Sequence, residues 1–250
     1  MTTLPIVLVH GFMGGSKQWD LQREYFADNR RFISPDLPGY GLNSHLEAPE
    51  TIEGFANYVL EELNRQGVDR FDLLGHSMGG MIVQEMMAIE PDCIEQLVLY
   101  GTAATGNLPN RFEPFETSRK HILEDGVNPS ARRICATWFL EYEHADQYEN
   151  CAAIAENSSL QALLAGLTAM ETWSRTDNLI SIPCPTLIIW GEKDRTYAWD
   201  QIDELWKTIP NSSLSVMPGC SHAAHLEKPL LFNMILDDFL SGAHRHKSTC

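Results

Sequence analysis

A serine enclosed by glycines is the most chemically suggestive feature of the sequence. Residues 75–80 are Gly-His-Ser-Met-Gly-Gly and directly follow an apolar run. The G-x-S-x-G spacing is typical of a sharp turn from a strand into a helix, with the serine at its apex. Gly75 and Gly79 leave room for strained backbone there, and the helix N-terminus favours developing negative charge. We therefore predict that Ser77 is a nucleophile, with His76 beside it in the turn.

A nucleophilic serine needs a base and an acid, and both types of residue occur downstream. Asp194 follows the apolar run 186–189, and His222 follows 214–216. Each comes a few residues after a predicted strand, and the carboxyl ends of parallel strands lie at one edge of a sheet. The pattern therefore predicts that Ser77, Asp194 and His222 form a catalytic triad.

An early loop is the candidate for binding an oxyanion. An apolar run at 4–9 is followed by His10, Gly11 and Phe12. One donor is expected to be the backbone N–H of Met78, after the nucleophile, and the second that of Phe12. Gly11 lets the backbone come close to a substrate carbonyl. Two preset N–H groups of this kind stabilise a tetrahedral oxyanion.

With these motifs, the chain resembles the α/β-hydrolase superfamily from end to end. It looks most similar to small bacterial serine esterases, 3-oxoadipate enol-lactonases and carrier-protein methylesterases. The resemblance implies a mostly parallel six-stranded sheet with helices on both faces, a helical cap inserted after the fourth strand, and no cofactor. The matching stretches are 9–12, 36–41, 75–80, 190–194 and 222–229.

Two histidines, His222 and His225, compete for the role of base. In the family pattern the histidine is followed, after four residues, by glutamate and an x-Pro ending, and Glu227 and Pro229 match this pattern from His222. The resemblance thus assigns the base to His222, and Asp200 remains an alternative acid. His-x-x-His spacing also suits a metal ion, but no third ligand accompanies it, so no metal is expected.

Apolar runs and helical patterns alternate along most of the chain. This alternation predicts right-handed crossovers and an α/β fold with a parallel sheet. The core is expected to comprise 1–101 and 184–241. Its expected strands are 5–10, 31–35, 69–74, 96–100, 185–190 and 213–217, and its expected helices are 18–28, 51–66, 79–90, 199–208 and 227–241.

One connection is far longer than a crossover needs. The insert 102–183 has a mainly helical pattern and stands where the family carries its cap, or lid. An apolar pocket for the acyl part of a substrate is expected beneath it. The expected cap helices are 115–125, 130–149, 150–157 and 159–174, and the candidate pocket residues are His10, Gly11, Trp138, Trp173 and His225.

Composition narrows the classes of partner. The net charge of −16 disfavours nucleic acid and anionic membrane surfaces. No apolar run is long enough to span a membrane and the start has no signal-peptide pattern, which predicts a cytoplasmic protein. We expect it to be a monomer or a homodimer. The six cysteines lack the short paired spacings of zinc or disulfide scaffolds. The polar tail 242–250 is expected to be flexible.

These observations favour hydrolysis of carboxylic esters or lactones of small, partly apolar substrates through an acyl-enzyme. Two alternatives stay open. One is C–C bond hydrolysis or a menaquinone-type elimination with the same triad, which requires a cationic pocket in the cap. The other is a small-molecule receptor or signalling module on the same fold. The arginines available for a cationic pocket are Arg111, Arg119, Arg132 and Arg133.

Overall fold

A single parallel sheet organises the molecule. The computed structural model describes residues 3–108, 111 and 113–242. The sheet has the order β2-β1-β3-β4-β5-β6, and each neighbouring pair is parallel, which confirms the expected fold class. Its strands are β1 (Ile6–Val9), β2 (Phe32–Ile33), β3 (Phe71–His76), β4 (Ile94–Tyr100), β5 (Thr186–Gly191) and β6 (Ser212–Met217).

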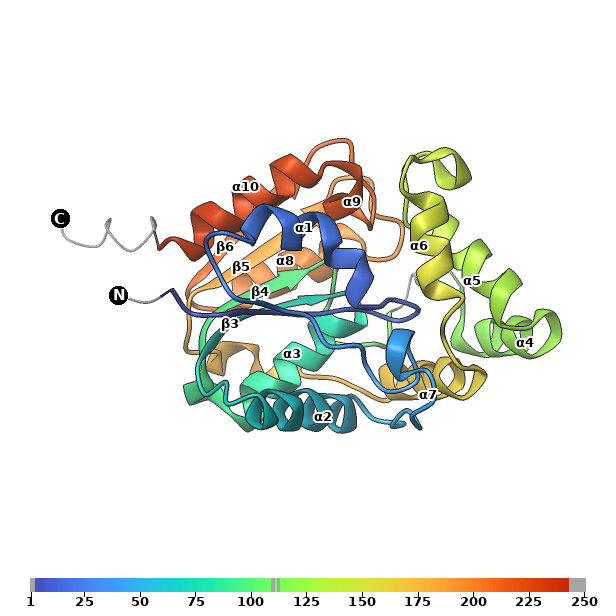
Figure 1. Cartoon of the computed structure of the whole chain (residues 1–250), viewed down its shortest axis with the longest axis horizontal. Helices are drawn as coiled ribbons and strands as arrows, with labels where there is room; N and C mark the ends of the chain where they lie inside the picture. Colours follow the sequence, from blue (N-terminus) through green and yellow to red (C-terminus); the bar gives the residue numbers. More distant parts are fainter. Residues whose placement is uncertain (1–2, 109–110, 112, 243–250) are drawn as a thin grey trace.

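Helices cover both faces of this sheet (Figure 1). Because side chains alternate along a strand, Ile6 and Leu8 pack with the helices of one face and Val7 and Val9 with those of the other. Burial on both faces explains why the strands are almost continuously apolar. One face carries α1 (Asp20–Phe26) and α10 (Pro229–Leu240), and the other carries α2 (Ile52–Arg65), α3 (Met78–Ile89) and α8 (Trp199–Thr208).

Two expected helices are subdivided. The expected helix 18–28 begins as the 3₁₀ turn Ser16–Trp19 and continues as α1. The expected helix 227–241 is divided into α9 (Ala224–Glu227) and α10. Pro229 is the first residue of α10. The N–H at this position makes no hydrogen bond within a helix, so a proline, which lacks the N–H, costs no bond there.

The segment 102–183 packs beyond the carboxyl ends of the strands (Figure 1). It contains α4 (Phe115–Asp125), α5 (Val127–Ala136), α6 (Tyr148–Ala155) and α7 (Leu160–Glu171). The prediction of one helix over 130–149 is wrong, because α5 ends at Ala136 and turns fill the stretch before α6. In those turns Leu140 gives its N–H to Glu227, a partner outside the segment, instead of to a helical carbonyl.

Where this segment leaves and rejoins the core, its two ends lie side by side. Thr105 and Ser174 form an antiparallel bridge, and Arg175 N–H donates to the carbonyl of Ala104 at 2.7 Å. Beside the bridge, the carboxylate of Glu85 on α3 accepts the indole N–H of Trp173 at 3.0 Å and pairs with the guanidinium of Arg175. The Glu85 side chain is only 6% exposed and that of Arg175 is 28% exposed, so this ion pair is a partly buried connection between segment and core.

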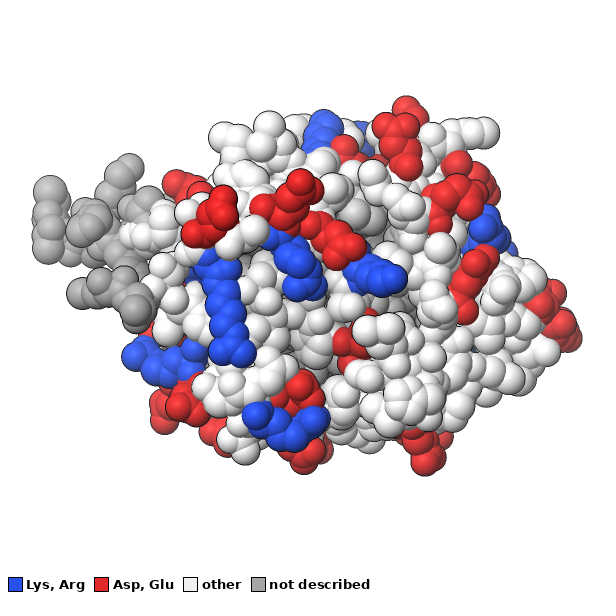
Figure 2. Space-filling view, in the orientation of Figure 1, with Lys and Arg blue, Asp and Glu red and all other residues white. Residues whose placement is uncertain are grey.

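Acidic and basic side chains are interspersed on the face of the molecule in Figure 2. This mixture is what a chain with 34 acidic and 18 basic residues presents when most of its charges are solvated. Within the described part of the chain, no helix has the length and apolar character needed to cross a membrane.

We predict that Glu85→Ala lowers the free energy of unfolding by about 3 kcal/mol, because it leaves Arg175 and Trp173 without their buried acceptor. Urea unfolding followed by circular dichroism measures this. The matched control is Glu149→Ala, which removes an exposed partner of Arg132 and is expected to leave the free energy of unfolding almost unchanged. Equal losses in the two variants would contradict the prediction.

Candidate active site

Ser77 occupies a strained position between β3 and α3. Its φ of 58° and ψ of −122° lie where residues other than glycine are uncommon. The surrounding backbone holds it there: Ser77 N–H donates to the carbonyl of Tyr100 at 3.0 Å, and Ser77 C=O accepts from Thr102 Oγ1 and Gly80 N–H, each at 2.8 Å. The hydroxyl is therefore presented at the end of the sheet by fixed partners on β4 and α3.

Glycines permit the close packing that this turn requires. A Cβ at Gly79 would lie 2.2 Å from the carbonyl oxygen of Val9, and one at Gly75 would lie 2.2 Å from the carbonyl oxygen of Gly79. A Cβ at Gly11 would lie 2.9 Å from the Cβ of Ser77. The early loop thus packs directly against the nucleophile turn.

His222 and Asp194 form a buried hydrogen-bonded pair. His222 Nδ1 lies 2.9 Å from Asp194 Oδ2, and the two side chains are 1% and 0% exposed. Asp194 Oδ1 accepts the backbone N–H groups of Thr196 and Tyr197 at 2.7 and 3.2 Å. Because the ionised carboxylate only accepts, Nδ1 carries the proton and the lone pair of His222 is on Nε2. This is the tautomer that a general base requires.

A glycine at the end of β4 makes room for this pair. Gly101 has a φ of 51°, and a Cβ there would lie 3.2 Å from His222 Nδ1 and 3.5 Å from Asp194 Oδ2. Sequence reasoning did not single out Gly101. Its position directly after a buried strand, at the same edge as Ser77, was the available signal.

Tyr197 lines the same cavity as Ser77. Within the described chain, the Ser77 hydroxyl makes no side-chain hydrogen bond to Tyr197 or to His222. The Tyr197 ring lies 5.7 Å from the imidazole of His222, with 31° between their planes. Burial raises the pKa of Tyr197 to about 12, so its phenol stays protonated at neutral pH. Sequence reasoning missed Tyr197, although it follows Asp194 by three residues.

Two buried side chains hydrogen-bond to the backbone carbonyl of His222. Its carbonyl accepts from the Tyr100 hydroxyl at 2.8 Å and from His76 Nε2 at 3.1 Å. Since the phenolic proton of Tyr100 is used there, its oxygen accepts from His225 Nδ1 at 3.0 Å. His76 and His225 thus lie behind His222, and His225 also contacts the ring of Trp19 at 4.7 Å between centroids.

These supporting histidines are held neutral by burial. Desolvation lowers the pKa of His225 to about 3 and takes the pKa of His76 well below its usual range. The nearby His222 adds to both effects, because a second positive charge would be repelled. Burial also lowers the pKa of His10. A charged form of any of the three would lack the hydration it has in the unfolded chain.

His10 fixes the early loop. Its Nδ1 donates to the carbonyl of Gly11 at 2.9 Å, and its Nε2 accepts the backbone N–H of Leu37 at 3.0 Å. The N–H of Phe12 makes no backbone hydrogen bond within the described chain. The N–H of Met78 is the first of α3 and so has no acceptor in its own helix. Both expected oxyanion donors are thus left available.

A small cavity opens at Ser77. It has a volume of about 40 Å³, which is room for a few water molecules. Of the candidate pocket residues, Trp138 lines it, whereas His10, Gly11, Trp173 and His225 do not. Trp173 points instead to Glu85. The other lining residues include Phe12, Met81, Arg111, Phe115, Ile134 and Tyr197.

The turn after α5 is fastened to both loops that carry the histidine and the aspartate. Ala223 N–H donates to the carbonyl of Trp138 at 2.9 Å. Glu227 bridges the two sides, because its carboxylate accepts Leu140 N–H and Ser221 N–H, each at 2.6 Å. We call residues 138–140 the clamped turn.

Arg195, directly after the aspartate, completes this attachment. Its guanidinium donates to the carbonyl of Phe139 at 2.8 Å and to that of Leu140 at 3.2 Å, and it lies over the ring of Tyr142. The partners of the Arg195 guanidinium in the clamped turn are thus backbone carbonyls.

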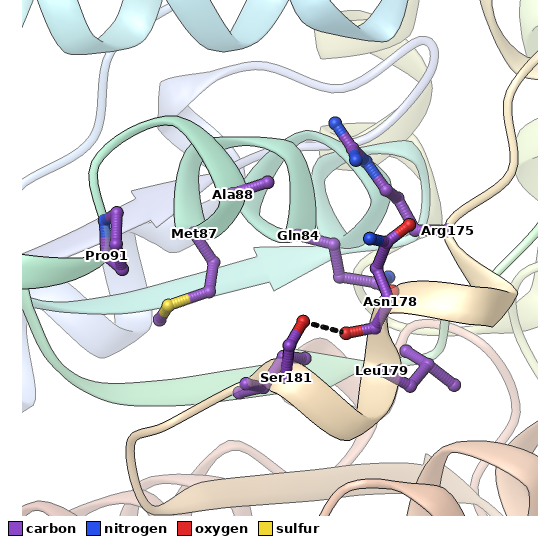
Figure 3. A pocket seen from close by; sticks show the side chains of 9 residues that line it. Gln84, Met87, Ala88, Pro91, Arg175, Asn178, Leu179 and Ser181 are labelled. Carbon is purple, nitrogen blue, oxygen red and sulfur yellow. Dashed lines mark hydrogen bonds between the residues drawn. The ribbon is translucent and has the colours of Figure 1, made fainter.

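A larger hollow lies elsewhere, between α3 and the 3₁₀ segment Thr176–Ser181 (Figure 3). It has a volume of about 290 Å³ and is lined by Gln84, Arg175 and Asn178 among others. None of the three triad candidates lines it, whereas Ser77 lines the smaller cavity. The described residues include no cluster of three or more His, Cys, Asp or Glu that could hold a metal ion.

Comparison with known proteins agrees with this architecture. The family model for the alpha/beta hydrolase fold matches residues 5–229. The chain belongs to this family. With this membership the resemblance found in the sequence is confirmed, and the chain is a hydrolase-family protein whose similar structures include esterases.

The similar proteins carry several hydrolase and synthase names. The chain is 25% identical over 243 residues to "Putative carbamate hydrolase RutD" of Pseudomonas savastanoi, covering 95% of this chain and 93% of that protein. It is 27% identical over 264 residues to "Putative 2-succinyl-6-hydroxy-2,4-cyclohexadiene-1-carboxylate synthase" of Bacillus subtilis, covering 95% and 90%. A thermophilic esterase from Thermogutta terrifontis, solved with malate bound, has a TM-score of 0.88 at 26% identity, covering 97% and 91%.

We predict that acid destabilises the fold through the buried histidines. His225 has a folded pKa of about 3 and an unfolded value near 6.5, so the unfolded chain binds the extra proton between these limits. Stability is therefore full above about pH 6.5 and falls as pH is lowered, by about 1.4 kcal/mol per pH unit for each such histidine. Urea unfolding at intervals from pH 7.5 to 5 measures the slope.

His225→Gln tests the assignment of this slope, because it removes one buried imidazole. We expect its stability to fall less steeply between pH 6.5 and 5 than that of the parent chain. His45→Gln, at an exposed position, is the matched control and should keep the parent slope. If His225→Gln keeps the full slope, burial of this histidine is not its source.

Proposed function

We propose that the protein is a serine hydrolase of carboxylic esters or lactones, with Ser77 as nucleophile, His222 as base and Asp194 as the acid. The observation that carries the proposal is the buried 2.9 Å pair of His222 and Asp194, beside a serine held at a strained strand-to-helix turn. Membership of the alpha/beta hydrolase family supports it. Small, partly apolar substrates suit the cavity, which is lined by Phe12 and Trp138.

In the proposed mechanism the Ser77 hydroxyl turns to Nε2 of His222, which takes its proton as Oγ attacks the carbonyl. Asp194 stabilises the imidazolium through Nδ1–H. The tetrahedral oxyanion is bound by the N–H groups of Phe12 and Met78. His222 then protonates the leaving alcohol, and water repeats the attack on the acyl-enzyme.

The segment 102–183 acts in this proposal as a cap over a core of 1–101 and 184–241. The neighbouring positions of its two ends, bridged at Thr105 and Ser174, support these boundaries. A cavity of about 40 Å³ is too small for an ester with several carbons on each side, so substrate entry requires parts of the cap to move. A closed cap also keeps bulk water from the acyl-enzyme.

A second candidate function is C–C cleavage or elimination with the same triad. The presence of Arg111 in the Ser77 cavity favours it, and a relative in Bacillus subtilis bears the name of a synthase. Arg119, Arg132 and Arg133 do not line this cavity. Of the four arginines considered for a cationic pocket, Arg111 alone is therefore at the site. Poor turnover of every simple ester would favour this candidate.

We expect Ser77→Ala to lower kcat/KM for short p-nitrophenyl esters by more than about 10³-fold, because no other group takes over the nucleophile's role. A fluorophosphonate probe should label Ser77, as located by mass spectrometry. Ser181→Ala, an exposed serine, is the control and should keep parent activity. A loss below tenfold in Ser77→Ala would remove Ser77 from the mechanism. Tight ligand binding without turnover would instead support a receptor.

A further inference from the structure

Tyr197 is a buried, hydroxyl-bearing residue of the cavity at Ser77. It lines the same space of about 40 Å³ and is only 3% exposed. Its N–H donates to Asp194 Oδ1 at 3.2 Å, and its carbonyl accepts the indole N–H of Trp190 at 3.0 Å. Neither bond uses the phenol, which donates to no acceptor within the described chain. Burial of a hydroxyl without an acceptor is costly, so this donor beside the nucleophile calls for a role with substrate.

The ring of Tyr197 lies against the pair formed by His222 and Asp194. Its centroid is 5.7 Å from that of the His222 imidazole, with 31° between the two ring planes. The carboxylate of Asp194 that pairs with His222 also accepts the Tyr197 N–H. Ring and backbone of Tyr197 are thus positioned by the two residues that hold the proton in the proposed mechanism.

The order of the strands puts Tyr197 and the expected oxyanion donors on opposite sides of Ser77. Ser77 follows β3, whereas Phe12 follows β1 on one side and Tyr197 follows β5 on the other. His222 follows β6 and so comes from the same side as Tyr197. In the proposed reaction the carbonyl oxygen points to the N–H groups of Phe12 and Met78, and the leaving oxygen faces His222, which protonates it. The phenol is therefore on the side of the leaving group.

The phenol is suited to donate a hydrogen bond rather than to give up its proton. Burial raises the pKa of Tyr197 to about 12, so its hydroxyl is protonated at neutral pH. A phenol of this kind is a far weaker acid than an imidazolium. His222 therefore remains the group that supplies the proton to the leaving oxygen, while Tyr197 can stabilise negative charge on that oxygen as it develops.

We propose that Tyr197 is a further catalytic residue, whose hydroxyl donates a hydrogen bond to the leaving-group oxygen as that oxygen is expelled. The proposal rests on the function proposed above. When the tetrahedral intermediate collapses, the C–O bond to the leaving group breaks, and its electron pair goes to the oxygen, which takes the proton from Nε2 of His222. The carbonyl re-forms on the acyl-enzyme, and Tyr197 keeps its own proton throughout. This assistance matters most for esters of alkyl alcohols, whose alkoxides are too basic to leave unaided.

The test varies the acidity of the leaving alcohol at nearly constant shape. Ethyl acetate is paired with trifluoroethyl acetate, and phenyl acetate with p-nitrophenyl acetate. The measured quantity is kcat/KM, which covers the steps up to loss of the alcohol, and the acid released is titrated. In Tyr197→Phe we expect kcat/KM for ethyl acetate to fall about 10- to 100-fold, the range for a hydrogen bond to a charged group, and that for p-nitrophenyl acetate to change by less than about threefold. The reason is that p-nitrophenolate is a stable anion and leaves without a donor.

The substitution removes the hydroxyl and keeps the ring that lies against His222. A loss that grows with the basicity of the leaving group is therefore not what a packing role would produce. Tyr25→Phe is the matched control, because Tyr25 is 36% exposed on α1 and does not line the cavity. It should keep the parent kcat/KM for all four esters. Thermal melts of each variant confirm folding.

The pattern of losses separates this proposal from the function on which it rests. Equal losses for all four esters in Tyr197→Phe would mean that the phenol acts before the alcohol leaves, and no loss for any ester would mean that it only lines the cavity. Either result overturns its role at the leaving group and leaves Ser77-dependent ester hydrolysis intact. If the parent chain turns over none of the four esters, ester hydrolysis fails and the role of Tyr197 in it fails as well.

Discussion

The whole site depends on how closely three pieces of backbone pack around Ser77. β1, β3 and α3 approach so closely that only glycine fits at positions 11, 75 and 79. Ser77, which lies in the turn between β3 and α3, takes a φ of 58°. Such a conformation costs about 1–3 kcal/mol, which a sheet buried on both faces can offset. Met13 and Tyr142 are the other described non-glycine residues with positive φ, and they lie in the early loop and beside the clamped turn. Backbone strain is thus concentrated around the proposed chemistry.

A second constraint is the layer of uncharged polar rings beneath the imidazole of His222. Tyr100, His76 and His225 fill this layer, and two of them donate to the His222 carbonyl. Uncharged rings give directional hydrogen bonds without the desolvation penalty of ions. They also keep additional positive charge away from His222, the proposed base. The Nε2 of His225 and the indole N–H of Trp19 remain without partners in this layer.

Sequence predicted the parts of the molecule that local rules determine. The sheet and the strand-to-helix turn at Ser77 were predictable because strand periodicity and glycine spacing are local. The hydrogen-bonded pair of Asp194 and His222 was expected because each residue follows a strand, and the catalytic roles of both stay predictions. The helix expected over 130–149 was wrong, since Glu227 and Arg195, both distant in sequence, bind the backbone of the clamped turn. Side-chain direction was equally beyond pattern reasoning, which is why Trp173 was chosen and Tyr197 was missed.

The bonds of the clamped turn bear on how the proposed cap would move. Residues 138–140 are hydrogen-bonded to the loops that bear Asp194 and His222, so movement of this turn would displace both side chains. Among the bonds described above, α4 makes none to those loops. Under the proposed function, a substrate path on the α4 side would therefore open with less disturbance of the hydrogen-bonded pair of His222 and Asp194.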